Sequence, residues 1–431
     1  MTCKSVQARV LVLTIAPGQW RQSLAVKSLI EMFEGDSRLS TIVADALRPL
    51  PSEVRRMNFD VVILTPMVLS ARHDSKKLQR VKDQLGELKT SRSLRVAMPQ
   101  DDYDGSHILD TWLDEWDTHL VFTPCPDNWS TLYPLCHTNR RLRKGYTSYI
   151  SKHQVASPEE WRSWECRIID VGYRASRLPY FFGALGQTKT EIVKTFGDKV
   201  VDQSRFSLDF AVGEKSFLSG KRWIRFIEDS RFMLASPSGS SIVDPLGDLR
   251  RLALQTIDQR LSMQEFFQLA SSRNCYWIEQ DNTAISPRNV EAALHGTAQI
   301  AVQHHFSGVL EPDRDYIPLS DKSLDTVLTD ELNWNEVRRN AYEAILSVRR
   351  LRSEFLVEEI LAELPSSRVR PRATCEISRL VISRSKLNLW MIQQLRAFVL
   401  SSLSWLRSWP SSARIIKSLK RRRDDERRPI A

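Results

Sequence analysis

The chain has 431 residues, of which 42% are hydrophobic and 26% are charged, a composition typical of a folded globular protein rather than of a disordered or fibrous chain. Its length exceeds that of one typical core, so we expect two domains and an extension. Half of the net charge of +10 lies in the last 18 residues, Arg414 to Ala431, and the nearly balanced remainder argues against a nucleic-acid-binding body.

The first part of the chain alternates strands and helices, a pattern typical of a parallel sheet covered on both faces. We predict strands at residues 8–16, 41–46, 59–65, 94–98 and 119–123, and helices at 24–33, 76–88 and 108–116. Ligands of such sheets bind beyond the carboxyl ends of the strands. The loop 99–104 (PQDDYD) follows the fourth strand, so it lies where a substrate would bind.

A second alternation follows a basic, loop-like segment at 139–160, which we interpret as a domain boundary. We predict strands at 166–171, 206–212 and 231–236, helices at 183–196 and 223–230, and a loop at 236–241 (SPSGSS). The predicted fold class is therefore α/β, with two facing Rossmann-like domains at 1–150 and 151–330. A small ligand would bind in the cleft between them.

The stretch 285–319 is the strongest candidate for binding a ligand. Ser286 is predicted to cap a helix whose first turn accepts Pro287. Arg288 and Glu291 then lie in the first turns, where an Arg can clamp a phosphate and a carboxylate can accept hydrogen bonds from a diol. An ordinary αβ unit with a solvent-facing Arg and Glu is the alternative interpretation.

The C-terminal part is predicted to contain helices at 331–365 that pack across both domains, and an amphipathic basic extension at 366–431. Residues 386–409 place polar and apolar side chains on opposite sides of a helix, with three tryptophans on or near the apolar side. Such a helix beside a basic tail suits an anionic membrane surface. Packing on its own protein or on a partner subunit is the alternative.

The six cysteines are scattered without the spacing of a metal site, so we expect free thiols in a reducing cytoplasm. No signal peptide and no run of about 20 apolar residues is visible in the sequence. We therefore expect a cytoplasmic protein, peripheral on the inner membrane face if the extension binds lipid.

Four blocks of residues carry a resemblance to a known family. They are 100–104 with 109–110 and 121–123; 172–174 with 178–180 and 183–189; 223–226 with 230–232, 238–241, Asp244 and Gly247; and 285–288 with 291–292, 312–313 and 316–319. In order and spacing they resemble a family of bacterial glycosyltransferase-like proteins of the two-Rossmann (GT-B) type, related to the group 1 glycosyltransferases and the CgeB spore-coat group. The resemblance covers roughly residues 95–320 and does not reach the tail.

The sequence departs from the family pattern in three places. Asp102 replaces a Glu, Asn289-Val290 replaces a bulky pair, and Ser236-Pro237 alters the approach to Ser238. The third departure changes a loop expected to contact the ligand, so it bears on activity more than on fold.

By this resemblance, the second domain would hold a nucleotide-sugar donor, with no other cofactor. Glu291 would accept hydrogen bonds from a pair of ribose or sugar hydroxyls. Arg174, Lys189 and Arg288 would neutralise the diphosphate as the leaving group gains charge. Surface cations at Arg174 and Lys189 are the alternative interpretation.

Ser238 and Gly239 would bring backbone N–H groups close to the phosphates, because glycine permits a close approach, and Ser286 would begin the donor-binding helix. A simple turn at 238–239 is the alternative. No motif for a divalent metal fits, and we expect the cations to bind the diphosphate without one.

The acceptor would enter from the first domain. There Asp102 is a candidate general base for an acceptor hydroxyl, and His107 is a second one. The loop could equally be structural, with Asp101 capping the next helix and Tyr103 packing against the core.

We predict a glycosyltransferase that moves a sugar to a cell-surface glycan or lipid-linked acceptor at the cytoplasmic face of the membrane. A nucleotide-sugar epimerase shares the two-Rossmann plan and is one alternative. A non-catalytic relative that binds polysaccharide or a partner enzyme is another, and nucleic-acid binding by the basic tail is a third.

Overall fold

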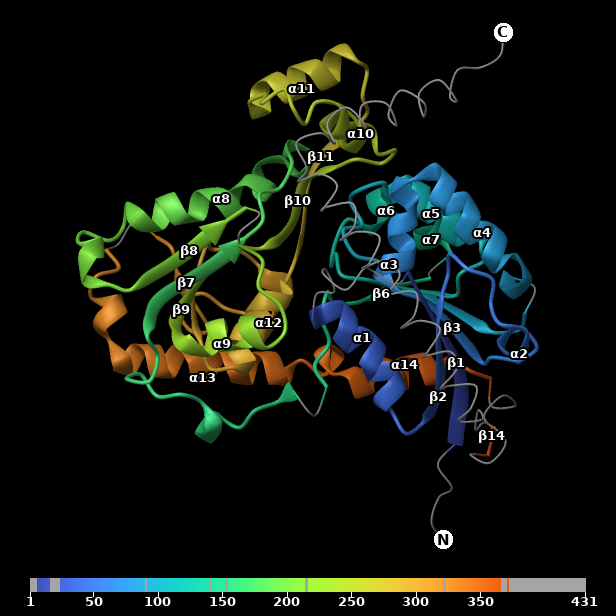
Figure 1. The fold of residues 1–431 in the computed structure, drawn as a ribbon, viewed down its shortest axis with the longest axis horizontal. Helices are drawn as coiled ribbons and strands as arrows, with labels where there is room; N and C mark the ends of the chain where they lie inside the picture. Colours follow the sequence, from blue (N-terminus) through green and yellow to red (C-terminus); the bar gives the residue numbers. More distant parts are fainter. Residues whose placement is uncertain are drawn as a thin grey trace, which may run out of the picture.

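The computed structural model describes residues 6–15, 24–89, 91–139, 141–151, 154–213, 216–320, 323–365 and 370–371. Figure 1 shows two lobes side by side, with the blue and cyan part of the chain in one and the green part mainly in the other. In this view an arm lies at the top between the lobes, and two helices run along the bottom from one lobe to the other.

The first lobe contains six parallel strands in the order β2-β1-β3-β4-β5-β6. They are β1 (Val6–Thr14), β2 (Leu39–Asp45), β3 (Val61–Leu64), β4 (Leu94–Ala97), β5 (Leu120–Thr123) and β6 (Leu142–Lys144). The short β14 (Arg370–Pro371) pairs antiparallel with the start of β1. Apolar runs form this sheet because both of its faces are buried: Val10 and Val12 of β1 join one core, and Leu11 and Leu13 join the other.

Helices cover both faces of the first sheet. They are α1 (Leu24–Gly35), α2 (Ser52–Arg55), α3 (Pro66–Leu69), α4 (Ser75–Lys89), α5 (Ser106–Glu115), α6 (Trp129–Leu132) and α7 (Pro134–Thr138). Leu29 and Phe33 of α1 pack into the core on one face, while Val81 of α4 and Trp112 of α5 pack into the core on the other.

The second lobe contains five parallel strands in the order β8-β7-β9-β12-β13. They are β7 (Ile169–Ala175), β8 (Leu208–Val212), β9 (Ser230–Ala235), β12 (Ala298–Ala301) and β13 (Ile317–Pro318), and the helices α8 (Gly183–Gly197), α9 (Lys221–Asp229) and α12 (Pro287–Leu294) accompany them. The predicted fold class, two facing Rossmann-like sheets with a helical C-terminal part, is confirmed.

A two-stranded arm, residues 238–284, projects from the second lobe (Figure 1). Its strands β10 (Ser238–Val243) and β11 (Ile278–Ala284) pair antiparallel, and α10 (Asp248–Gln255) and α11 (Met263–Ser272) connect them. The predicted loop at 236–241 is therefore wrong for most of its length. SGSSIV has no clear alternation of apolar residues, and its pairing partner lies about 40 residues further along the chain.

Two C-terminal helices cross from the second lobe back to the first. In α13 (Glu331–Ser347), the Trp334 indole donates to the Arg231 carbonyl of the second lobe at 2.7 Å. In α14 (Ser353–Ala362), Leu356 and Val357 pack in the core that contains Val10 of the first lobe. The extension 366–431, with its predicted membrane helix, lies outside the described residues apart from β14.

Among the described helices, none combines the length and apolar character needed to cross a membrane. The four cysteines in this part of the chain, Cys125, Cys136, Cys166 and Cys275, are free thiols.

Candidate functional site

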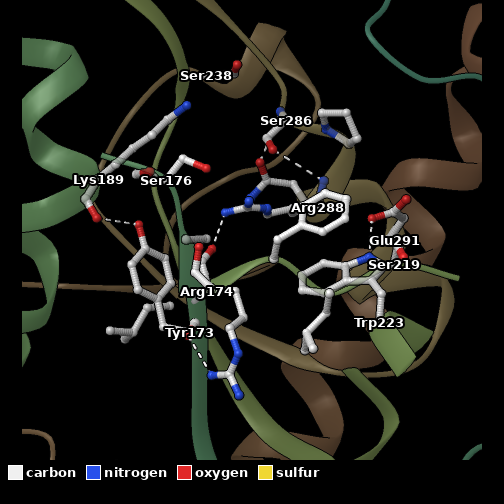
Figure 2. A pocket seen from close by; sticks show the side chains of 18 of the residues that line it. Tyr173, Arg174, Ser176, Lys189, Ser219, Trp223, Ser238, Ser286, Arg288 and Glu291 are labelled. Carbon is white, nitrogen blue, oxygen red and sulfur yellow. Dashed lines mark hydrogen bonds between the residues drawn. The ribbon is translucent and has the colours of Figure 1, made fainter. Parts of the chain in front are cut away.

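A cavity of about 310 Å³ opens beyond the carboxyl ends of the second-lobe strands (Figure 2). Ser176 follows β7, residues 216–219 follow β8, and Ser236 follows β9. Gln100, which comes after β4 of the first lobe, also borders the cavity. The cavity therefore lies at the edge of the sheet where parallel α/β folds bind ligands.

Six of the residues predicted from sequence border this cavity: Arg174, Lys189, Ser238, Ser286, Arg288 and Glu291. Three others do not line it: Gly239, Asp102 and His107. The predicted residues of the first lobe, Asp102 and His107, therefore lie away from the cavity. Those of the second lobe border it, apart from Gly239.

The start of α12 forms as predicted. Ser286 is the N-cap, and its hydroxyl oxygen accepts from the Arg288 backbone N–H at 3.2 Å. The Asn289 side chain accepts in return from the Ser286 backbone N–H at 3.1 Å. Pro287 occupies the first turn, whose N–H groups need no partner inside the helix. This local capping directs Arg288 and the following turn toward the cavity.

Arg288 and Lys189 bring two cations to the cavity from different helices. Arg288 donates to the Arg174 carbonyl, and its guanidinium lies 5.7 Å from the centre of the Trp223 ring. Lys189 comes from α8 and extends toward Ser238 in Figure 2. Burial lowers the pKa of both groups, and the charge of Arg288 lowers the pKa of Lys189 further. Neither cation forms an ion pair within the described ranges. An anion in the cavity would stabilise both charges and so offset the lowering of their pKa values.

Glu291 lies one helical turn beyond Arg288. One of its carboxylate oxygens accepts from the Trp223 indole N–H at 2.8 Å. Burial raises its pKa to about 7, although the Trp223 hydrogen bond and the Arg288 charge oppose this rise. At neutral pH the carboxyl therefore exists in both protonation states, and its second oxygen is available for a ligand hydroxyl.

Arg174 does not have the predicted role. Its guanidinium donates to the Asp209 carboxylate at 2.7 Å and to the Asp209 carbonyl at 2.8 Å, and it stacks 4.1 Å from the Phe226 ring centre. Figure 2 shows this side chain directed away from Arg288. Its charge is already neutralised, so Arg174 contributes to the cavity through the carbonyl that positions Arg288.

The predicted role of Gly239 is also corrected. Its φ is 138°, and a Cβ atom there would lie 2.0 Å from the Asn282 carbonyl oxygen. Glycine is needed because β10 and β11 approach closely, rather than to admit a phosphate. Only Ser238, at the start of β10, borders the cavity.

The two predicted bases, Asp102 and His107, lie within the first lobe. Asp102 is fully buried, and its carboxylate accepts from the hydroxyls of Thr123 and Tyr133. A ring nitrogen of His107 lies 3.0 Å from the Thr131 carbonyl. These contacts correct both assignments, because neither side chain borders the cavity where an acceptor would meet the donor.

The alternative interpretation of the loop 99–104, a structural role, is correct for Tyr103 but not for Asp101. Tyr103 packs edge-on against Phe182 of the second lobe, with ring centres 5.9 Å apart. Asp101, however, does not cap α5, whose N-cap is Gly105. The loop is thus a contact between the lobes.

Sequence reasoning missed Ser176 because it ended a strand too early, and it assigned no role to the loop 216–219 that follows β8. The strand was predicted to stop before Gly172, whereas β7 continues to Ala175. A Cβ at Gly172 would lie 2.5 Å from the Ser230 hydroxyl, so this glycine permits close packing within the sheet instead of ending the strand.

Among the described residues, no group of three or more His, Cys, Asp or Glu side chains is arranged to hold a metal ion. No family model matches this chain, and no curated protein sequence matches it.

Several solved structures are similar to this chain at low identity. Anabaena HepE in complex with UDP-glucose is 12% identical, with a TM-score of 0.45, over 83% of this chain and 99% of that one. An α-glucosyltransferase in complex with UDP and DNA is 10% identical, with a TM-score of 0.46, over 83% and 99%. The spinosyn rhamnosyltransferase SpnG is 11% identical, with a TM-score of 0.36, over 83% and 100%. All three TM-scores are below 0.5, and the function proposed below does not depend on them.

Proposed function

We propose that the protein is a glycosyltransferase that binds a nucleoside-diphosphate sugar in the second-lobe cavity. The observation that carries this proposal is a pair of cations, Lys189 and Arg288, that face one cavity without an ion-pair partner in the described chain. Glu291 lies one turn beyond Arg288 on the same helix and borders the same cavity.

The two cations would stabilise the reaction electrostatically. As the bond between the sugar and the diphosphate breaks, negative charge grows on the leaving phosphate, and preorganised cations in a partly buried site lower the energy of this state. The same charges would bind the diphosphate without a divalent metal. Glu291 would accept hydrogen bonds from two neighbouring hydroxyls of the ribose or of a hexose.

We infer that the acceptor is a glycan or a lipid-linked sugar that reaches the cavity from the first lobe, beside Gln100. Transfer would take place at the cytoplasmic face of a membrane, with the amphipathic segment 386–409 and the basic tail on the lipid surface.

Nucleoside diphosphates test the donor site directly. UDP, GDP and CDP are each titrated into the full-length protein while its melting temperature is recorded. At least one should raise the melting temperature, because a ligand that binds only the folded state stabilises it. If none of the three produces a shift, the donor assignment is contradicted and a non-catalytic relative is favoured.

Deletion of residues 386–431 tests the membrane assignment. The full chain should sediment with vesicles that contain anionic phosphatidylserine, and the deleted chain should stay in the supernatant. Raising the salt concentration should weaken binding of the full chain, since basic residues contribute through screened charge. Equal sedimentation of the two chains would exclude this role for the extension.

A further inference from the structure

The arm 238–284 joins the two lobes at a second place, opposite the first. In Figure 1 the arm lies at the top between the lobes, whereas α13 and α14 run along the bottom from one lobe to the other. Two lobes joined at one end only can rotate about that end as a hinge. A second attachment at the opposite end must break before such a rotation, so the contacts of the arm decide whether the lobes can open.

The arm binds the first lobe through backbone hydrogen bonds just beyond the end of β10. The Gly105 N–H of the first lobe donates to the Asp244 carbonyl at 2.7 Å, and the Asp244 N–H donates to the Tyr103 carbonyl at 2.8 Å. The His107 N–H donates to the Pro245 carbonyl at 3.1 Å. These are the hydrogen bonds that usually join strands within a sheet, and here they join one lobe to the other.

Apolar side chains of the arm are buried against the first lobe. Val243, the last residue of β10, has 0% of its surface exposed and belongs to the core that contains Leu109 and Trp112 of α5. Ile278, the first residue of β11, packs against the same core. Withdrawal of the arm would expose these side chains to water, so their burial opposes separation of the lobes.

Two polar contacts hold other parts of the arm. The Asp104 carboxylate of the first lobe, which is 2% exposed, forms an ion pair with Arg250 of α10. The Asp281 carbonyl of β11 accepts from the Asn128 side chain at 2.8 Å. Withdrawal of α10 would take the cation away from a buried carboxylate, which is costly.

The loop of the first lobe that receives the arm is itself held in place. The buried Arg72 guanidinium donates to three of its carbonyl oxygens at 2.7 to 3.0 Å, those of Gln100, Asp101 and Asp104. Gly105 has a φ of 66°, a left-handed conformation that glycine adopts at little cost. The arm therefore meets a surface that its own lobe has already fixed.

The other end of β10 borders the cavity. Ser238, the first residue of this strand, lines the cavity, whereas Val243 at its last position is buried in the first-lobe core. Gln100 borders the cavity from the first lobe, in the loop that Arg72 holds. One short strand thus connects the cavity wall to the opposite lobe, so its attachment sets the distance between the two sides of the cavity.

We propose that the arm is a strap that holds the two lobes in one arrangement. The lobes then do not open and close about α13 and α14, and the cavity keeps its shape before a ligand binds. Relative motion is the usual expectation for two lobes of one chain, and the strap predicts the opposite. This inference goes beyond the proposed function, because it concerns the lobes whether or not a ligand is bound.

Hydrogen exchange of the unliganded, full-length protein tests the strap. The interlobe peptides are those that contain the amides of Gly105, His107 and Asp244, and these amides exchange when the strap detaches. Mass spectrometry should show these three amides protected at least about 1,000-fold relative to an unstructured peptide. Weaker protection would mean that the lobes open readily, and it would overturn the strap.

A pair of neighbouring arginines gives a matched comparison. Arg250→Ala removes the ion pair with Asp104 of the first lobe, whereas Arg251→Ala removes an ion pair with Asp248 inside the arm. We expect exchange of the interlobe peptides to be at least about tenfold faster in Arg250→Ala and unchanged in Arg251→Ala. The peptide that contains β3 should exchange as in the wild type, because detachment leaves the first lobe folded.

Two results with these variants would contradict the strap. Equal exchange of the interlobe peptides in both would show that the ion pair between the lobes does not hold the arm. Faster exchange of the β3 peptide together with the interlobe peptides in Arg250→Ala would show a general loss of stability instead of detachment. If Arg250→Ala does not fold, the wild-type measurement decides.

Small-angle scattering adds a test with ligand. The nucleoside diphosphate that raises the melting temperature should leave the radius of gyration of the wild type unchanged, since strapped lobes have no closure to complete. A smaller radius with ligand would overturn the strap and leave the donor site in place. If no nucleoside diphosphate binds, the proposed function is contradicted, and the exchange measurements still decide the strap.

Discussion

Short motifs predicted both the residues on the donor side of the cavity and those of the loop after β4. Only the donor-side residues lie where their motif indicates. Lys189, Arg288 and Glu291 come together around one cavity. In the loop, Asp102 is buried among Thr123 and Tyr133. A motif therefore predicts the positions of its side chains well when local geometry sets their directions. It predicts them poorly when contacts with distant parts of the chain set them.

The helix α12 is a case of local control. Its cap, its first-turn proline and the spacing of Arg288 and Glu291 lie within six residues, so one turn of helix fixes their directions. The loop after β4 depends instead on Arg72, which precedes it by about 30 residues, and on Arg250, which follows it by about 150. No local pattern distinguishes the exposed Asp101 from the buried Asp102.

Removal of the Arg288 charge should have the largest effect. We expect Arg288→Ala to weaken binding of the nucleoside diphosphate that the wild type prefers by at least about 30-fold, since truncation of a buried charge partner costs about 2–5 kcal/mol. Arg222→Ala, at an exposed position of α9, is the matched control and should bind as the wild type does. Calorimetry measures both. Equal affinities for the two variants would remove Arg288 from the site.

A smaller effect is expected at Gly239, and it separates stability from binding. Gly239→Ala places a Cβ against the Asn282 carbonyl, so the free energy of unfolding should fall by about 1–3 kcal/mol while nucleotide affinity changes little. Gly86→Ala, in α4, has no atom within 4 Å of the added Cβ and should not destabilise. Denaturant unfolding measures stability. Loss of affinity without loss of stability would restore the phosphate-binding role that was predicted for Gly239.

A third effect is the pH dependence of stability that Glu291 contributes without ligand. Its folded pKa of about 7 is above the unfolded value, so ionisation costs stability above pH 7, and this cost disappears as the pH falls from 7 toward 4.5. Glu291→Gln should therefore be more stable than the wild type at pH 8.5, by at most about 3 kcal/mol, and equally stable near pH 4.5. Thermal unfolding across this range measures the difference. A difference between the two proteins that does not change with pH would show that the carboxyl is not buried as described.

The sequence predicts an element of the fold well when the contacts that form it are close along the chain, and poorly when they are distant. The apolar runs of β1 and β3, and the charged helix α4, form where expected because burial on a sheet and helical periodicity are local patterns. The arm was not predicted, because its strands β10 and β11 are polar and pair across two intervening helices. The strand predicted for β7 ended too early, before Gly172. In the sequence, a glycine that permits close packing within a sheet cannot be distinguished from one that ends a strand.

A crystal structure with the best-binding nucleoside diphosphate tests the central claim most directly. The account predicts that Lys189 and Arg288 contact the two phosphates and that Glu291 accepts from the ribose or sugar hydroxyls. A diphosphate bound elsewhere, or bound in this cavity with Arg288 and Glu291 directed away from it, would contradict the account.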